Sequence, residues 1–432
     1  VLKGAGGSGY NYAFDWFDGA TINVLGDATI EGNIGGHNPG AILTFNVAEG
    51  KTLTIAGKFD GGTYSGNSSL AVSGAGTLKL TNAANNYRGT TTINASATLE
   101  LEDGSLGTGA VTGAGNLVCT GVLPPATAAL NAEAWTGTVK VQNFTGGTES
   151  ESAELDLDAY GNANSVVELA NVAGWVADGT VVENLKLSGP FSQNYGSQET
   201  PAKITIKKLS GVGNFNGPSG ADWRYAFFVG DCSEFTGSVN LKSGGHGGFI
   251  SFVVGSVPEN YDHIDCRTHI TVMADGVANV PEGATWMPAT GAGGKTRVYG
   301  TIGGAGSIDS ALEFFDGATI DGSVRATGNV TLPATGTVTV SGEAGATVLT
   351  CPNAASLDLT KFSAPEGLKC VAEDGAIKLA VANVPFNPAT AGSMSVEVAA
   401  ATGDDAMAMV DIQRPEGVED DVVTISLLTQ AV

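Results

Sequence analysis

Apolar and polar residues alternate along short stretches of the chain, as at Thr52–Ile55, Thr77–Leu80 and Thr98–Leu101. A period of two residues places apolar side chains on one face of a β-strand and polar side chains on the other. Gly, Asn and Asp separate these stretches, and few segments have the 3.6-residue apolar period of a helix. The pattern therefore predicts an all-β protein built from short strands.

Three sequence units recur along the chain. The first has the pattern small-Gly-[Ala/Val]-Gly-polar-apolar and begins at Ser73, Thr112, Ser210 and Gly303. The second has an aromatic residue followed two positions later by Gly, and it begins at Tyr87, Trp135 and Phe235. The third is the hexapeptide FDGATI, which begins at Phe17 and at Phe315. Because glycine tolerates positive φ, we expect these units to turn tightly at Gly74, Gly76, Gly89, Gly137 and Gly237. The fixed distance from each glycine to the next apolar run favours a right-handed parallel β-helix over a sandwich, whose hairpins prefer Asn-Gly turns.

Residues 73–117 resemble the autotransporter-associated β-strand repeat, also called the passenger-associated transport repeat. The matching positions are Gly74, Gly76, Thr77, Leu78, Asn85, Tyr87, Gly89, Thr92, Ile93, Asn94, Thr98, Leu99, Gly104, Ser105, Leu106 and Gly107, whereas Arg88 and Ala95 depart from the pattern in or beside turns. Stretches beginning at Trp135, Tyr160 and Leu357 are more loosely similar to large surface proteins of Verrucomicrobia and Lentisphaerae. The resemblance implies an extracellular β-helical passenger on a Gram-negative cell surface.

Composition and charge exclude several classes of protein. Hydrophobic residues make up 42% of the chain and charged residues only 15%, whereas a disordered chain has low hydrophobicity and high charge. The 20 basic and 44 acidic residues give a net charge of −24, which repels nucleic acid and anionic membrane surfaces. No stretch approaches the roughly 18 apolar residues of a transmembrane helix, so we expect no membrane insertion in this segment.

Changes in texture divide the chain into four predicted sections. Residues 1–122 form a β-helix section with the repeat, and Pro124-Pro125 opens a β-rich section over residues 123–290 with longer inserts. Residues 291–382 repeat the earlier units and form a second β-helix section. Residues 383–432 have fewer Gly repeats and are predicted to be a small β module or a linker.

The five cysteines suggest two disulfides. Cys351 and Cys370 flank 18 residues and are expected to pair if the compartment is oxidising, and Cys232 with Cys266 is a second candidate pair. The alternative is that they are buried free thiols. Cys266 also lies three residues from both His263 and His269, but a loop with ordinary histidines is favoured there over a metal site. We expect no metal and no cofactor.

No set of residues matches a known catalytic constellation. The chain lacks a GxSxG elbow and a phosphate-binding GxxxxGK loop, and Asp18 and Asp316 occupy the same slot of a repeat, which favours a structural turn. Aromatic residues provide the remaining functional signal, because their faces can stack on sugar rings. The candidates are Tyr12, Trp16, Trp223 and Tyr225, with core filling as the alternative role.

These observations predict a non-enzymatic extracellular structural or adhesive surface protein, a rigid β-helix that presents its loops to the environment. A self-assembling surface-layer or filament subunit is one alternative, because the end of a stack of strands exposes unpaired edges. A polysaccharide-active enzyme is the other. The expected partners are accordingly further copies of the chain or glycans.

Overall fold

The computed structural model of the 432-residue chain describes residues 12–16, 19–36, 40–60, 68–102, 106–146, 154–193, 202–217, 225–241, 250–257, 269–288, 293–382, 408–413 and 424–429. Among the described residues, strands account for 53% and helices for 3%. Except for the pairs that involve β37 and the pair β38–β39, the strand pairs are parallel. The prediction of an all-β protein with parallel sheets is confirmed.

Two sheets lie beside the longest series of strands in the first part of the chain. One contains β1 (Tyr12–Trp16), β4 (Asn33–Gly36) and β7 (Phe59–Asp60). The other, which we call the N-terminal side sheet, contains β2 (Ala20–Val24), β5 (Ile42–Val47), β8 (Ser69–Ser73), β10 (Thr91–Ile93) and β12 (Val111–Gly113).

The longest series of paired strands, which we call the main ladder, extends through most of the described chain. It contains β3 (Ala28–Ile30), β6 (Thr52–Ile55), β9 (Thr77–Leu80), β11 (Thr98–Glu102), β13 (Asn116–Thr120), β14 (Thr138–Thr145), β15 (Val166–Gly174), β16 (Val181–Leu187), β18 (Ala202–Gly211), β20 (Tyr225–Phe235), β22 (Ile250–Val254), β23 (Ile270–Val272), β26 (Lys295–Val298), β29 (Ala311–Phe314) and β32 (Val330–Thr331).

A second series branches from β15, and a further sheet lies in the last third of the chain. The branch contains β17 (Phe191–Gln193), β19 (Phe215–Asn216), β21 (Val239–Asn240), β25 (Thr285–Met287), β28 (Ser307–Ile308), β31 (Val324–Ala326), β34 (Thr347–Thr350), β37 (Ala376–Val381) and β36 (Leu368–Glu373). The further sheet contains β24 (Val277–Asn279), β27 (Thr301–Gly304), β30 (Thr319–Gly322), β33 (Val338–Val340) and β35 (Phe362–Ser363). The remaining elements are the 3-10 turns η1 (Ala126–Ala128), η2 (Ala354–Ser356) and η3 (Leu359–Lys361) and the hairpin β38 (Ala408–Gln413) with β39 (Thr424–Thr429).

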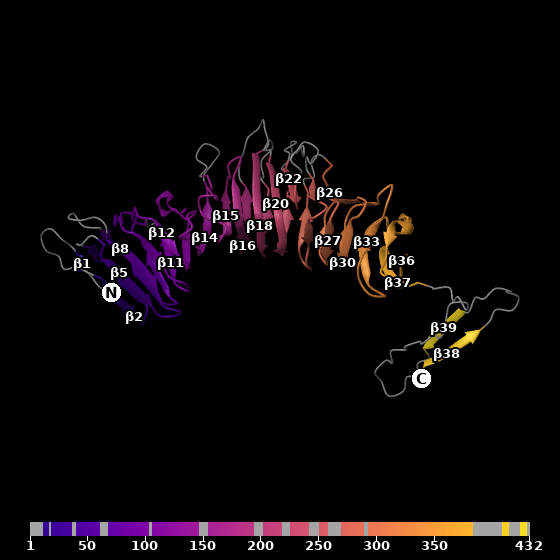
Figure 1. Ribbon diagram of the computed structural model, residues 1–432, viewed down its shortest axis with the longest axis horizontal. Helices are drawn as coiled ribbons and strands as arrows, with labels where there is room; N and C mark the ends of the chain where they lie inside the picture. The colour runs from indigo at the N-terminus through magenta and orange to yellow at the C-terminus, as the bar shows by residue number, and fades with distance from the viewer. Residues whose placement is uncertain are drawn as a thin grey trace.

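The chain visits these sheets in a repeating order, and we call one round of visits a pass. In the first part, β2, β3 and β4 are followed by β5, β6 and β7, and each strand pairs with its equivalent in the next pass. In the last part, β26, β27 and β28 are followed by β29, β30 and β31 in the same manner. The strands therefore lie side by side along the long axis of the molecule, from β1 at one end toward β37 at the other (Figure 1).

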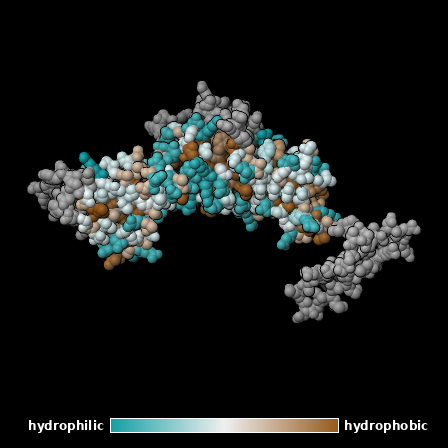
Figure 2. All heavy atoms as spheres, in the orientation of Figure 1, coloured by the Kyte–Doolittle hydropathy of each residue, from teal (hydrophilic) through white to brown (hydrophobic). Residues whose placement is uncertain are grey.

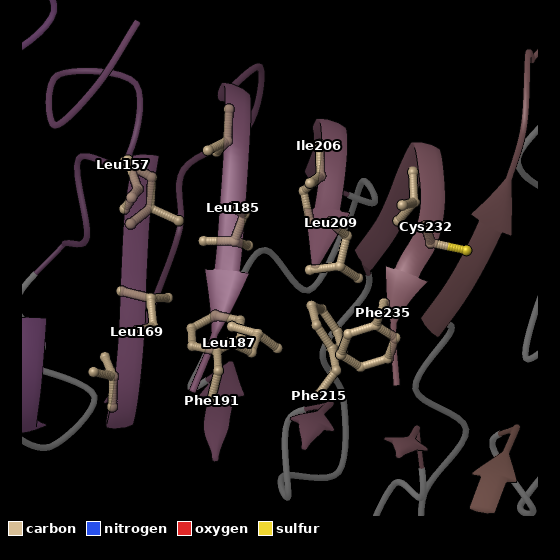
Figure 3. Packing of buried hydrophobic residues seen from close by; sticks show 14 of the residues in the cluster. Leu157, Leu169, Leu185, Leu187, Phe191, Ile206, Leu209, Phe215, Cys232 and Phe235 are labelled. Atoms are coloured by element: carbon tan, nitrogen blue, oxygen red, sulfur yellow. The ribbon is translucent and has the colours of Figure 1, made fainter. Parts of the chain in front are cut away.

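The pairing register places aliphatic residues on aliphatic residues. Leu53, Leu78, Leu99, Leu117 and Val139 are successive partners in the main ladder, and each is buried. Figure 3 shows how buried side chains from successive strands face the same interior, with Leu187 beside the ring of Phe191. The core is thus a set of columns that extend from pass to pass, and each pass depends on its neighbours for burial.

Aromatic rings fill the core where the middle strands are longest. The ring of Phe215 contacts Phe191, Phe227 and Phe252 edge-on at centroid distances of 5.5, 4.7 and 5.3 Å, and Phe252 in turn contacts Trp286 at 5.8 Å. Edge-to-face pairs of this kind are favourable beyond the area that they bury. The aromatic group fills the interior between the main ladder and its branch.

The recurring glycines have two different physical roles. Gly74 has φ of +81° and forms the predicted tight turn. Gly76, Gly89, Gly137 and Gly237 also lie at bends before strands, but their φ is not positive, so positive φ is not the reason for glycine there. At each of these four, a Cβ would collide with an atom of the preceding pass, and at Gly237 that atom is the carbonyl oxygen of Gly213. Glycine is needed there because adjacent passes approach too closely for any side chain.

Sheet pairing continues across two of the predicted section boundaries. β13 pairs with β14 across position 122, and β23 pairs with β26 across position 290. The Pro124-Pro125 pair lies between β13 and β14, next to η1, where it removes no ladder hydrogen bond. The ladders end with β37 at Val381, close to the predicted boundary at 382, and the hairpin β38–β39 belongs to the section after it.

The glycine contacts lead to a stability prediction. In Gly137→Ala, the added Cβ would overlap the Gly115 carbonyl oxygen and lie 2.7 Å from the Trp135 ring. We expect the free energy of unfolding to fall by about 1–3 kcal/mol, as for other overpacked sites. Urea denaturation followed by circular dichroism measures the change. The control is Gly26→Ala, whose Cβ meets nothing within 4 Å; equal midpoints for the two variants would refute the role of close approach.

Candidate functional site

Charged residues form a column on the outward face of the main ladder. Successive partners along this column are Lys79, Glu100, Val118, Lys140, Glu168 and Lys186. The Glu168 carboxylate bridges two passes, with one oxygen 3.1 Å from Lys140 Nζ and the other 2.8 Å from Lys186 Nζ. Further pairs between passes join Lys207 to Glu183 and Lys208 to Glu234. Lys79, Lys140, Lys186, Lys207 and Lys208 are thus paired with acids of an adjacent pass.

Glu168 is the most buried acid of this column. Desolvation alone would raise the pKa of its carboxyl, but the hydrogen bonds from Lys186 and Lys140 outweigh it and hold the pKa below its usual value. The carboxylate is therefore charged at neutral pH. It joins adjacent passes and is not available as a general acid.

The N-terminal side sheet has an outward face without charge. Its five strands contain no Asp, Glu, Lys or Arg. One outward column has the partners Thr21, Thr44, Ala71, Thr92 and Thr112, and the next has Asn23, Asn46 and Ser73. Side chains bond along these columns, since the Asn46 amide donates to Asn23 Oδ1 at 2.9 Å and the Thr92 and Thr112 hydroxyls lie 3.2 Å apart. We call this surface the uncharged face.

The uncharged face contrasts with the charged column of the main ladder, and the branch strands β17, β19, β21, β25 and β28 are likewise without charged residues. In Figure 2 the N-terminal part of the molecule has mostly residues of intermediate hydropathy, whereas hydrophilic residues dominate the middle part. Hydroxyl and amide groups both donate and accept hydrogen bonds. A surface of such groups is chemically suited to contact another uncharged, hydroxyl-rich surface.

A polar cluster surrounds His269 beside β26. The backbone N–H of Lys295 donates to His269 Nδ1 at 3.0 Å, and Arg297 Nε lies 3.3 Å from Glu313 Oε2. Burial, followed by the charges of Arg297 and Lys295, lowers the pKa of His269 to about 4. The imidazole is neutral at pH 7 and is a weak base. His263 and Cys266, the other members of the metal site considered from the sequence, lie outside the described residues.

Three acids follow one another at alternate positions before β15. A hydrogen bond with Asp158, followed by partial burial and the charges of Asp158 and Glu154, raises the pKa of Asp156 to about 6. Asp156 can therefore hold a proton at mildly acidic pH. The three residues are exposed at the surface, and the described part of the chain contains no group of His, Cys, Asp and Glu arranged to hold a metal ion.

The structure corrects the prediction that Tyr225 stacks on glycans. Tyr225 is 1% exposed and lies in β20, with its ring stacked on Phe227 at a centroid distance of 5.7 Å. Burial raises the pKa of its hydroxyl to about 12. Trp223 lies outside the described residues, as do the side chains of Tyr12 and Trp16 in β1. The burial of Tyr225 is indicated by the apolar alternation of Tyr225, Phe227 and Val229, which occupy one face of a strand.

The four cysteines in the described part of the chain are not bonded to one another, contrary to the expected Cys351–Cys370 disulfide. Both are buried free thiols. Cys351 follows β34 and Cys370 lies in β36, with β37 between these two strands. Strands two positions apart are separated by about 9–10 Å, beyond the roughly 7 Å limit on the Cα separation of a disulfide.

The other described cysteines have packing roles. Cys119 lies between Leu101 and Val141 in an inward apolar column. Cys232 is a free thiol whose Sγ donates to the Val277 carbonyl at 3.2 Å, and its expected partner Cys266 lies outside the described residues. Burial raises the pKa of both Cys119 and Cys232 to about 12, which suppresses their reactivity.

Comparison with protein-family models, with curated proteins and with solved structures found no match to this chain. The resemblance of residues 73–117 to the autotransporter-associated repeat therefore stays a prediction. Among the residues that the structure describes, no helix is long and apolar enough to cross a membrane.

Thiol labelling tests the state of the cysteines. We expect Cys119, Cys232, Cys351 and Cys370 to react little with maleimide in the native protein, because they are buried. After unfolding without a reducing agent, all four are expected to label, as read by peptide mass spectrometry. If Cys351 and Cys370 labelled only after reduction, the free-thiol assignment would be wrong.

The pH dependence of stability tests the Glu168 bridge. Because the pKa of Glu168 is lowered by folding, its contribution is present above the unfolded pKa of about 4.3 and is lost as pH falls through the folded pKa. Glu168→Gln is expected to reduce the free energy of unfolding by about 1–2 kcal/mol at pH 7 and by less at pH 3.5. The exposed pair of Glu183 with Lys207 is the control, and Glu183→Gln should cost less than about 1 kcal/mol. A constant effect of Glu168→Gln across this range would contradict the bridge.

Proposed function

We propose that the chain forms a right-handed parallel β-helix and acts outside the cell as a non-enzymatic structural and adhesive protein. The observation that supports this most strongly is the repeating strand order, in which each strand pairs in parallel with its equivalent in the next pass. The inward columns then form a continuous core, and the sheet faces and loops are presented along a rod. The repeat-like pattern of residues 73–117 supports a place at the cell surface.

The uncharged face is the surface that we assign to adhesion. Thr44 and Thr92 lie in the column that runs from Thr21 to Thr112, and their side chains project from parallel strands. Neutral glycans present hydroxyl groups that both donate and accept hydrogen bonds, which matches the threonine and asparagine side chains of this face. Acidic glycans are repelled by the net charge of −24.

One observation favours the enzyme alternative. The raised pKa of Asp156, with Asp158 and Glu154 beside it, resembles the paired acids of a glycosidase, in which one carboxyl is protonated. These acids are exposed at the surface, whereas catalytic groups usually converge in a concave site. We therefore place adhesion first and keep hydrolysis as a result that the assay can reveal.

Adsorption to insoluble neutral glycans tests the proposal. We expect the protein to bind cellulose or chitin without releasing soluble sugar, as measured by depletion of protein from solution and by reducing-end assays. Thr44→Lys with Thr92→Lys introduces charge into the uncharged face and is expected to weaken adsorption by about tenfold or more.

The control for this experiment is Thr54→Lys with Thr98→Lys, which introduces the same two charges on the outward face of the main ladder. Thr54 is half-buried like Thr44 and Thr92, so the variants differ mainly in the face that they change. Equal loss of binding in both variants would remove the uncharged face from the proposal. Release of sugar that Asp156→Asn abolishes would support the enzyme instead.

A further inference from the structure

The outward columns of the uncharged face form a regular grid. The first column has the successive partners Thr21, Thr44, Ala71, Thr92 and Thr112, and the second lies two residues further along each strand. Paired strands are about 4.7–4.9 Å apart, and two residues along a strand advance by about 6.6 Å. Polar groups therefore recur at one short interval along the long axis of the molecule, the direction in which the strands lie side by side (Figure 1).

The side chains of both columns have capacity for further hydrogen bonds. Asn23 and Asn46 are exposed, and the Asn46 amide donates to Asn23 Oδ1 at 2.9 Å. The Thr92 and Thr112 hydroxyls, which lie 3.2 Å apart, share one hydrogen bond. A hydroxyl has one donor and two acceptor sites, and a carboxamide has two donors and an acceptor oxygen. One bond along a column therefore leaves each group able to bind a ligand as well.

The interval between strands distinguishes among uncharged polymers. An extended β-1,4-linked glycan advances by nearly the same distance with each sugar unit and presents hydroxyl groups along both edges. An extended peptide advances by about 3.3 Å per residue, so its polar groups do not keep the interval of the columns. An α-1,4-linked glycan coils and cannot follow a straight column.

We infer that the uncharged face binds one extended β-1,4-linked glycan chain lengthwise, with one sugar unit over each strand. The five strands of the N-terminal side sheet then hold five consecutive units. The small side chain of Ala71 allows the sugar rings to lie close to the sheet at the centre of the column. The inference rests on the proposed adhesive function and adds to it the class of glycan and the direction of the bound chain.

A lengthwise site predicts that affinity depends on the length of the glycan. Each added unit gains the contacts of one more strand while the chain is already held by the others. We expect the dissociation constant to fall by about tenfold or more between oligomers of two and of five units. Isothermal titration calorimetry measures this with β-1,4-linked oligomers of glucose and of N-acetylglucosamine. An α-1,4-linked glucose oligomer of five units should bind about tenfold more weakly than its β-linked counterpart, or not at all.

Ala71→Lys tests whether the column acts as a continuous site. Ala71 is half-buried and faces outward, so a long charged side chain there interrupts the column and leaves two strands on either side. We expect the five-unit oligomer to bind about tenfold or more weakly, and the two-unit oligomer to keep its affinity within about twofold. The matched control is Thr54→Lys, which places the same charge on the outward face of the main ladder and should leave the length dependence unchanged. Circular dichroism shows whether each variant keeps the parent fold.

The outcomes separate this inference from the proposed function. A protein that adsorbs to neither cellulose nor chitin overturns both. Three results overturn lengthwise binding alone in a protein that does adsorb. They are an affinity for soluble β-1,4-linked oligomers that is absent or does not rise with length, equal binding of the α-linked oligomer, and an Ala71→Lys variant that loses the two-unit and five-unit oligomers equally.

Discussion

Backbone hydrogen bonds between successive passes fix the position of nearly every buried side chain in this protein. Parallel strands lie about 4.7–4.9 Å apart, so each residue meets its equivalent in the next pass at that distance. The spacing makes the inward columns of aliphatic residues continuous and brings opposite charges into contact at Glu168. It also excludes a side chain where two passes cross closely, as at Gly137 and Gly237. The core, the charged column and the glycine positions are consequences of one distance.

Much of the fold could be predicted from the sequence, because the alternation of apolar and polar residues is a local property. Thr77–Leu80 and Thr98–Leu101 lie in strands, with their leucines inward. The role of Gly137 could not be predicted in the same way, since the carbonyl oxygen that excludes a side chain there belongs to Gly115 in the preceding pass. The Cys351–Cys370 pair was mispredicted for a related reason. A separation of 18 residues contains no information about β37, which lies between their strands.

The candidate site was less predictable than the fold. The prediction treated Tyr225 as an exposed aromatic residue, but it is buried in β20. The adjacent strand β22 is buried on both faces, so this part of the main ladder is covered on both sides. The uncharged face was missed because its members are separated by about twenty residues or more and become neighbours only through the register of β2, β5, β8, β10 and β12. Outward residues of several passes would have to be aligned before the absence of charge became visible.

Distances between spin labels along one outward column test the stacking of passes most directly. Thr52 and Thr138 are 86 residues apart in sequence but only four strand pairings apart in the ladder. Thr54 and Ser210 are 156 residues apart in sequence and seven strand pairings apart. Stacked passes predict label separations of about 19 Å and 34 Å, respectively. Measurement by double electron–electron resonance on these two double-cysteine variants, with a Cys266→Ser background, would support the account if the distances increased with the number of pairings. Broad distributions, or distances unrelated to that number, would contradict it.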